Sequence, residues 1–279
     1  MTARNCVLIG AALLVLASGI GFCCVGARPL AMGGAFIGLA DDANATYWNP
    51  AGIARFEANK ATAMYTASNR EEINYLGYAA YAGRLPGRNL GYGLSYVSHQ
   101  LNLEGYGLDE QSWLWVSGAF RANADTTVGL NVRFIDDSIS GLSTEMGLDL
   151  AVLRVVDEKW SFGLLIQDIN EPKIKDGSTT LAVHGRNIRP GIAYHCDERT
   201  VITADIYDMF DQSNAMALRV GGERILRSGL AVRAGYYGFG NSGGVTLGLG
   251  GKVGSVQMDG ALMTGDLENT ILISASSGY

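Results

Sequence analysis

Apolar and polar residues alternate along most of the chain, from residue 58 to the C-terminus, within short segments that end in Gly, Asn, Asp or Ser. A period of two is the period of a β-strand, whose successive side chains point to opposite faces. The clearest segments have one apolar face and one face of Gly, Ser, Asn, Asp, Glu or Arg. They are TTVGLNVRF at 126–134, EMGLDLAV at 145–152 and WSFGLLIQ at 160–167.

The pattern predicts fourteen strands, near residues 58–67, 72–82, 89–98, 111–120, 126–135, 143–153, 159–168, 188–195, 200–208, 214–223, 229–237, 244–252, 254–263 and 268–278. An even number of amphipathic strands is typical of outer-membrane barrels, in which about 9–11 residues cross the bilayer and closure pairs every backbone group. The sequence therefore predicts an all-β fold, a 14-stranded antiparallel transmembrane β-barrel over residues 58–279. The alternative is a soluble, exported β-sandwich.

The predicted connections alternate in length, as they do in barrels with short periplasmic turns and longer outside loops. The expected outside loops include LNLEGYGLDE at 101–110 and INEPKIKDGSTTLAVHGRN at 169–187, whereas RANAD, VVDE and ERILRS are short inside turns. Aromatic residues near strand ends are expected in the girdles at the two membrane interfaces. These residues are Trp113, Trp115, Trp160, Tyr236 and Tyr237.

The start of the chain predicts a secretory signal peptide. A single basic residue precedes an uncharged apolar stretch that ends in small residues, which is the pattern of an export leader. We expect this leader to span residues 1–26, with cleavage between Gly19 and Ala27. An uncleaved membrane anchor and a lipoprotein signal at Cys23 or Cys24 are the alternatives. Beyond the leader, no apolar run approaches the roughly 18 residues of a membrane helix, so a membrane could be crossed only by strands.

Composition narrows the classes of partner. The 279 residues include 38 Gly and only 5 Pro, so the glycines belong to strands and turns, not to a collagen-like or Pro-rich chain. The net charge is −6 and the 21 basic residues are scattered, which excludes nucleic acid as a partner. Of the four cysteines, only Cys196 lies clearly beyond the leader, so we expect neither a disulfide framework nor a cysteine-based metal site.

Residues 27–57 match neither the leader before them nor the strands after them. Fourteen strands enclose a lumen that is too wide for wall side chains alone to fill, so we expect this segment to be an N-terminal hatch, or plug, inside the barrel. Asn49 is a good helix N-cap and Pro50 suits the first helical position, which predicts a short helical turn. Asp41 and Asp42 are expected to pair with arginines of the lumen.

The stretch RPLAMGGAFIGLADDANATYWNPAGIA at 28–54 resembles the N-terminal signature of the FadL-like outer-membrane proteins, most closely that of the shorter PorV/PorQ-like branch. The resemblance implies a fourteen-stranded barrel with this segment as its hatch. It also implies transport of fatty acids or other hydrophobic molecules for the FadL type, and a part in type IX protein export for the PorV/PorQ-like branch. A folded N-terminal cap without a transport role is the alternative. The hatch motif residues are Asp41, Asp42, Tyr47, Trp48, Asn49, Pro50 and Ala51.

Charged residues on the faces opposite the apolar ones form a candidate polar site in the lumen: Arg133, Glu145, Asp149, Asp205, Arg219 and Arg233. If a turn centres near Ile139, Arg133 faces Glu145 on the next strand. By the same counting, Asp205, Arg219 and Arg233 form one row. Two facing arginines need an anion, supplied either by carboxylates of the protein or by a ligand. Both arginines are expected to point into the lumen, within reach of a carboxylate.

The sequence contains no catalytic constellation. His99, His184 and His195 have no carboxylate or Cys at the spacing of a metal site or a triad. We therefore expect a non-enzymatic protein of the bacterial outer membrane, surrounded by lipid, with no cofactor and no metal. One candidate function is transport of small hydrophobic molecules through the plugged lumen. The others are a component of a secretion or envelope assembly with partner proteins, and a simple aqueous porin.

Overall fold

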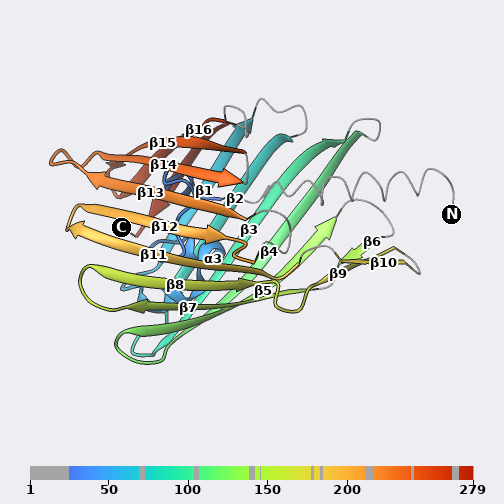
Figure 1. Cartoon of the computed structure of the whole chain (residues 1–279), viewed down its shortest axis with the longest axis horizontal. Helices are drawn as coiled ribbons and strands as arrows, with labels where there is room; N and C mark the ends of the chain where they lie inside the picture. The colour runs from blue at the N-terminus through green and yellow to red at the C-terminus, as the bar shows by residue number, and fades with distance from the viewer. Residues whose placement is uncertain are drawn as a thin grey trace.

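The computed structural model describes residues 25–68, 73–103, 107–137, 142–144, 146–176, 179–182, 185–210, 216–239, 242–265 and 270–278. These residues form a closed antiparallel barrel of fourteen strands that follow one another around the ring in chain order, with the first paired to the last (Figure 1). The barrel strands are β1 (Lys60–Ser68), β2 (Ile73–Arg84), β3 (Leu90–Leu103), β4 (Gly107–Arg121), β5 (Thr126–Asp137), β7 (Gly147–Val155), β8 (Trp160–Gln167), β11 (Asn187–Asp197), β12 (Thr200–Tyr207), β13 (Ala217–Ile225), β14 (Ala231–Phe239), β15 (Ser242–Val253), β16 (Val256–Met263) and β17 (Thr270–Ser277).

The predicted fold class is confirmed, since each of the fourteen expected segments overlaps one barrel strand. Two predicted boundaries are wrong. LNLEGYGLDE is not mainly a loop, because β3 and β4 continue through it and Leu103 pairs with Gly107. The strand expected at 143–153 begins only at Gly147, while Thr144 ends a separate short strand.

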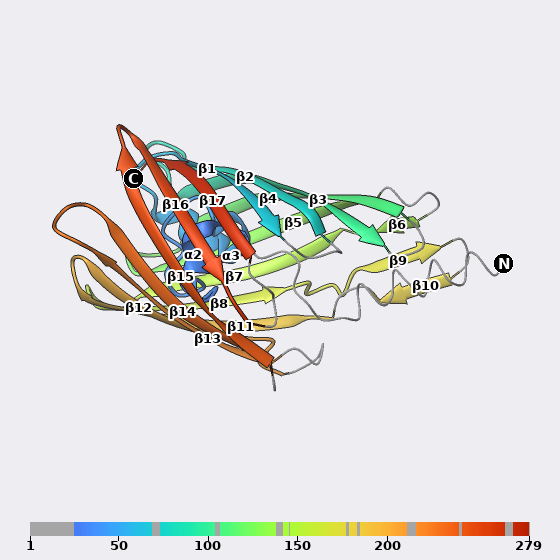
Figure 2. The same ribbon diagram turned by 90° about the horizontal axis from the view of Figure 1, so that it is seen from above.

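A small second sheet was not predicted. Its strands are β6 (Leu142–Thr144), β9 (Lys173–Asp176) and β10 (Thr179–Ala182), in the order β10-β9-β6. It lies beyond the end of the barrel that carries the longer connections (Figures 1 and 2). Segments of three or four residues contain too few alternations for a period of two to be recognised.

The apolar faces of the strands point outward. Along β8, Phe162 is 46% exposed and Leu164 is 36% exposed, whereas Ser161 and Leu165 are buried. Exposed large apolar side chains occur on strands all around the ring. A soluble sandwich would bury its apolar faces, so this exposed band is the surface that meets the hydrocarbon of a bilayer.

Three of the five aromatic residues expected in the interface girdles lie inside the barrel instead. Trp113, Trp115 and Tyr237 are 9%, 1% and 2% exposed, while Trp160 and Tyr236 are 39% and 46% exposed on the outer face. The prediction failed on β4 because that strand carries large apolar residues on both faces. Alternation alone then cannot tell the lumen side from the lipid side.

The N-terminal segment lies inside the ring of strands (Figure 2). It contains α2 (Ala27–Ala31), α3 (Ala45–Trp48) and the 3₁₀ helix η1 (Pro50–Arg55). α2 contacts β14 to β17, and η1 contacts β2 to β5 and β7. The expected helical turn is present as η1, and the Asn49 side chain caps it by accepting a hydrogen bond from the Ala51 N–H group at 3.1 Å. Among the described residues, no helix is long and apolar enough to cross a membrane.

Two substitutions on β15 test which surface faces lipid. Leu247, near the middle of the strand, is 55% exposed, and Val253, at its end, is 71% exposed. Leu247→Arg is expected to lower the free energy of unfolding from a bilayer by about 2–4 kcal/mol, because the charge must enter hydrocarbon. Val253→Arg is expected to cost about 0–1 kcal/mol, because it lies near the interface. Denaturant unfolding in liposomes measures both, and equal losses would contradict the assignment.

Candidate functional site

Glycines on the inner wall let the plug backbone lie directly against the strands. A Cβ atom on Gly163 would lie 2.0 Å from the carbonyl oxygen of Ile37, and one on Gly221 would lie 2.2 Å from that of Met32. A Cβ on Gly129 would lie 2.3 Å from the backbone nitrogen of Ala51. No larger residue fits at these positions without moving backbone. The Gly-rich inner faces are therefore the surface on which residues 25–56 dock.

Polar wall side chains satisfy backbone groups of the plug. The Asp205 carboxylate accepts hydrogen bonds from the N–H groups of Phe36 at 2.6 Å and Ile37 at 2.9 Å. Buried backbone N–H groups without a partner are costly, so these contacts stabilise the docked segment. In addition, the Gly33 N–H group donates to the Thr246 hydroxyl, which donates to the Ala31 carbonyl. The Asn131 amide donates to the Thr46 carbonyl, and the Ser161 hydroxyl donates to the Gly38 carbonyl.

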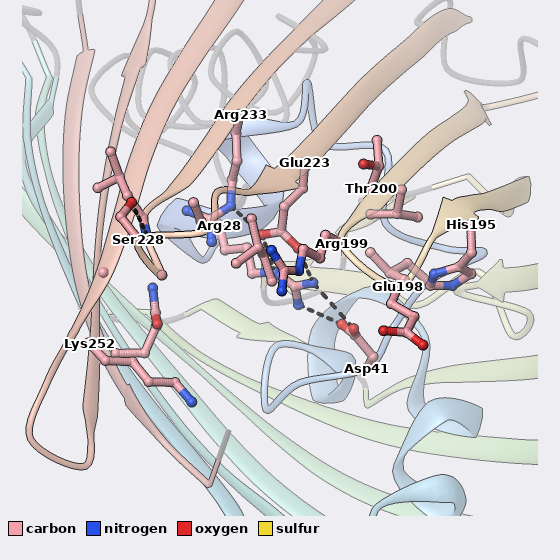
Figure 3. Close-up of a pocket in the computed structure, with 18 of the residues that line it drawn as sticks. Arg28, Asp41, His195, Glu198, Arg199, Thr200, Glu223, Ser228, Arg233 and Lys252 are labelled. Carbon is pink, nitrogen blue, oxygen red and sulfur yellow. Dashed lines mark hydrogen bonds and ion pairs between the residues drawn. The ribbon is translucent and has the colours of Figure 1, made fainter.

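Arg28 in α2 is the centre of a buried ion network. Its Nε and Nη2 atoms donate to the two carboxylate oxygens of Glu223 on β13, at 3.0 and 2.9 Å. Its Nη1 atom donates to Asp42 at 2.8 Å, and the same group also pairs with Asp41 (Figure 3). Glu223 in turn accepts from Arg233 on β14 at 2.6 Å. The network therefore joins the plug to two wall strands.

Each charge in this network needs a partner of opposite charge, because most of these side chains are buried away from water. The side chains of Arg28 and Glu223 are each 7% exposed, and those of Asp42 and Arg233 are 1% and 2% exposed. Burial opposes the charge on the Arg28 guanidinium, but the carboxylates of Asp41, Glu223 and Asp42 raise its pKa well above its ordinary value. Buried charges persist only where partners and hydrogen bonds compensate the lost hydration.

The acids of the hatch pair with an arginine inside the lumen that belongs to the plug itself. Asp41 and Asp42 both bind Arg28, and Arg28 also binds Glu223 on the wall. The sequence analysis missed Arg28. A signal was present, since Arg28 is the single basic residue between Arg4 and Arg55, and the two adjacent acids follow it 13 and 14 residues later.

Arg219 and Arg233 both point into the lumen, but they do not face each other. Arg219 lies opposite Asp205 on β12, and its guanidinium lies 4.5 Å from the ring centroid of Tyr207. Arg233 lies opposite Glu223 and also binds Asp259 at 2.8 Å. The predicted single row of Asp205, Arg219 and Arg233 is wrong because the hairpin between β13 and β14 turns two residues later than counted. The carboxylates that bind Arg233 are therefore side chains of the protein, Glu223 and Asp259.

The second predicted pair also differs in register. Arg133 lies opposite Gly147, and Glu145 falls outside the described residues. Arg133 binds Asp168 at 2.6 Å, a residue at the end of β8 that the sequence analysis did not consider. The buried Asp149 accepts a hydrogen bond from the Asp168 N–H group at 2.9 Å. The polar cluster forms, but with a different carboxylate, since a shift of two residues keeps the same face and changes the partner.

The remaining residues of the hatch motif hold the plug in shape and against the inner wall. Trp48 donates its indole N–H to the Val25 carbonyl at 2.9 Å, and the Asn49 amide donates to the carbonyls of Ile37 and Val152. Pro50 and Ala51 begin the buried helix η1. These residues hold the plug in shape, which is a structural role.

Aromatic rings line the lumen beside the plug. Ring centroids follow one another at 5.2 Å from Trp48 to Tyr47, 5.5 Å from Tyr47 to Trp115, 5.7 Å from Trp115 to Trp113 and 5.9 Å from Trp113 to His99. The last three rings belong to β3 and β4. This part of the inner wall is therefore rich in aromatic rings, and the Arg133 guanidinium lies 5.1 Å from the centroid of the Trp113 ring.

Two pockets open at the end of the barrel that carries the short turns. One has a volume of ≈ 710 Å³ and is lined by plug and wall residues that include Arg28, Asp41, Glu198, Arg199 and Glu223 (Figure 3). The other has a volume of ≈ 650 Å³ and lies beside the turn at 157–158. Both are lined by Leu39, Asp41, Lys60 and His195. His99 is buried, His184 lies outside the described residues, and no group of metal-binding residues occurs among the residues described.

The fold defines the class: a closed antiparallel barrel of fourteen strands with an apolar outer face and an N-terminal plug, as in FadL-type barrels. The fold is similar to that of the Ralstonia pickettii toluene transporter TbuX (12% identity, TM-score 0.67, 91% of this chain and 98% of that chain). It is also similar to the Pseudomonas putida toluene transporter TodX (13%, 0.66, 91% and 98%) and to a Pseudomonas aeruginosa FadL homologue (12%, 0.62, 88% and 93%). No family model and no curated protein matches the sequence. At these identities the likeness concerns the fold.

Gly163→Val tests the docking of the plug. The added side chain meets the Ile37 backbone, so the plug is expected to shift and become accessible to chymotrypsin at Phe36 and Trp48, which are 0% and 1% exposed. Gly118→Val is the control, because a Cβ there meets no atom within 4 Å. Equal protection of the two variants in a digestion time course would show that the contact is not needed.

Glu223→Ala tests the ion network. It leaves Arg28 and Arg233 buried beside each other without the shared carboxylate, so we expect a loss of about 3–5 kcal/mol in the free energy of unfolding. Glu198→Ala removes an exposed acid at the same end of the barrel and is expected to change stability by less than about 0.5 kcal/mol. Denaturant unfolding in liposomes compares them, and similar values would refute a stabilising role.

Proposed function

We propose that the protein lies in the bacterial outer membrane and lets small hydrophobic molecules cross it. The observation that carries this proposal is the aromatic inner wall formed by His99, Trp113 and Trp115, next to Tyr47 of the plug. An aqueous channel needs a polar lining, whereas apolar molecules gain free energy by leaving water for an apolar surface. The toluene transporters TbuX and TodX share the fold, which supports the same substrate class.

Three parts of the chain have separate roles in this proposal. Residues 1–26 act as a cleaved export signal, residues 27–57 act as the hatch, and residues 58–279 form the barrel. Outer-membrane lipid surrounds the apolar band. The lumen charges position the hatch and do not bind a charged ligand, because Arg133 pairs with Asp168, and Arg233 pairs with Glu223 and Asp259.

The experiment measures uptake of radiolabelled toluene by cells that produce the protein and by cells that do not. A hydrophobic transporter increases toluene uptake and leaves uptake of a small sugar unchanged. Equal gains for both solutes would indicate an aqueous porin. No gain for either, together with a copurifying exported protein, would favour the secretion role implied by the PorV/PorQ-like motif.

Trp115→Gln is expected to lower toluene uptake by about tenfold, because a polar amide replaces the large apolar ring that packs on Tyr47 of the plug. Trp160→Gln is the matched control, because Trp160 lies on the outer face and is 39% exposed. Uptake is normalised to the amount of folded barrel, scored by its heat-dependent migration in gel electrophoresis. Equal uptake by the two variants would contradict a path along the aromatic wall.

A further inference from the structure

An outward-facing arginine lies on β7, at the end of the barrel that carries the short turns. Arg154 is the last residue but one of this strand. It lies on the same face as Leu150 and Val152, which are 42% and 37% exposed on the outside of the barrel. Phe162 of β8 lies directly opposite it. The charge of Arg154 therefore stands on the face that carries the apolar band.

The Arg154 side chain has no protein partner in the part of the chain that the structure describes. It is exposed and forms no hydrogen bond or ion pair with any residue of the described ranges. Its neighbours across the strands are Thr126 of β5 and Phe162 of β8. A guanidinium is always charged in proteins and carries five N–H donors. Beside hydrocarbon it needs an anion or water within its reach.

Three aromatic rings lie beside Arg154 on β8 and β11, which follow β7 around the ring (Figure 1). The ring of Phe162 stacks on that of Trp160, with a centroid distance of 6.3 Å and an interplanar angle of 15°. Trp160 also contacts Tyr194, with a centroid distance of 4.4 Å. We call Trp160, Phe162 and Tyr194 the aromatic plate. Together with Arg154 it forms a surface that is apolar over most of its area and cationic at one edge.

The aromatic plate lies where the outer face of the barrel reaches the lipid headgroups. Trp160 is the first residue of β8, directly after the turn at 156–159. Trp and Tyr side chains collect at the boundary between hydrocarbon and headgroups. Arg154 lies opposite Phe162, two residues beyond Trp160, which is about 7 Å along a strand. A long arginine side chain spans such a distance by extending toward the interface, so its guanidinium is within reach of lipid phosphates.

The acids of the adjoining turn are engaged elsewhere. The Asp157 carboxylate accepts hydrogen bonds from the N–H groups of Lys159 at 2.8 Å and Trp160 at 2.7 Å, so it caps the turn. Glu158 lines the pocket of ≈ 650 Å³ at the mouth of the lumen. Neither acid is bonded to Arg154, whose charge therefore remains for an anion from outside the described part of the chain.

A second outward-facing arginine at the same end provides a contrast. Arg224 of β13 donates to the Thr200 hydroxyl at 3.0 Å, and its guanidinium lies 3.9 Å from the Asp197 carboxylate. Its side chain is 60% exposed. Arg224 thus has partners of its own on the neighbouring strand and turn, whereas Arg154 has an aromatic surface beside it and no carboxylate.

We propose that Arg154 and the aromatic plate form a binding site for one anionic phospholipid of the leaflet at the short-turn end. Arg154 donates to the phosphate, whose oxygens match the fork of a guanidinium. The rings pack on the glycerol and on the first acyl carbons. This inference rests on the proposed location in the outer membrane and goes beyond the proposed transport. The bound lipid holds this end of the barrel at the level of the headgroups.

The test places the full-length barrel in phosphatidylcholine bilayers with increasing fractions of phosphatidylglycerol whose acyl chains are brominated and quench tryptophan fluorescence on contact. Of the four tryptophans, Trp160 is exposed on the outer face, while Trp48, Trp113 and Trp115 are buried. The difference between the protein and its Trp160→Phe variant isolates the signal of Trp160. Brominated phosphatidylcholine, measured in the same way, gives the preference for the anionic headgroup.

We expect phosphatidylglycerol to be preferred over phosphatidylcholine at Trp160 by about fivefold, the effect of one basic residue at an anionic lipid surface. Arg154→Gln is expected to abolish this preference. Arg154→Lys should keep part of it, because the charge remains and the forked geometry is lost. Arg224→Gln is the matched control and should leave the preference unchanged.

Three outcomes would overturn the proposal. The first is no preference in the unsubstituted protein, and the second is an equal loss in Arg154→Gln and Arg224→Gln, which would mean attraction to positive charge in general. The third is loss of the preference in an excess of inorganic phosphate at constant ionic strength, which would indicate a site for free phosphate. Heat-dependent migration in gel electrophoresis verifies that each variant is folded. The quenching needs no transported molecule, so its outcome is separate from that of the toluene uptake experiment.

Discussion

A closed ring of fourteen strands encloses more space than its own side chains fill, and the rest of this structure follows from how that space is occupied. The chain fills it with its own N-terminal segment, docked backbone against backbone. The contact is possible because Gly129, Gly163 and Gly221 present no side chain where Ala51, Ile37 and Met32 arrive. Glycine normally weakens a strand, so its frequency here reflects a surface shaped for the plug.

Filling a lumen with peptide creates an electrostatic requirement as well as a steric one. Backbone groups and charges that leave water need partners. Asp205 and Thr246 meet the plug backbone, while Arg28 gathers Asp41, Asp42 and Glu223. These contacts make most of the plug a fixed part of the barrel. Asp41 is the half-exposed member of this network, at 47%, whereas the Asp42 side chain is 1% exposed.

The outer and inner faces of the barrel strands differ in composition because they contact different surroundings. The outer band is apolar because hydrocarbon surrounds it, and the inner wall is small or polar where the plug docks. β4 departs from this division, since Trp113 and Trp115 add an apolar surface on the lumen side. That departure places large aromatic rings against the plug, where the other strands present small or polar side chains.

The sequence by itself determined the fold. Fourteen alternating segments between Gly- and Asn-rich turns predicted the barrel strands, and the mismatch of residues 27–57 with this pattern predicted a segment for the lumen, because both are local properties with a fixed period. Asn49 and Pro50 likewise predicted their helical turn. Only the tertiary structure decided which charges meet. Arg233 binds Glu223 and Asp259, Arg133 binds Asp168, and Arg28 joins residues up to 195 positions apart. Pairings of this kind depend on strand register and on the pose of the plug, and a shift of two residues keeps every side chain on its face while changing its partner.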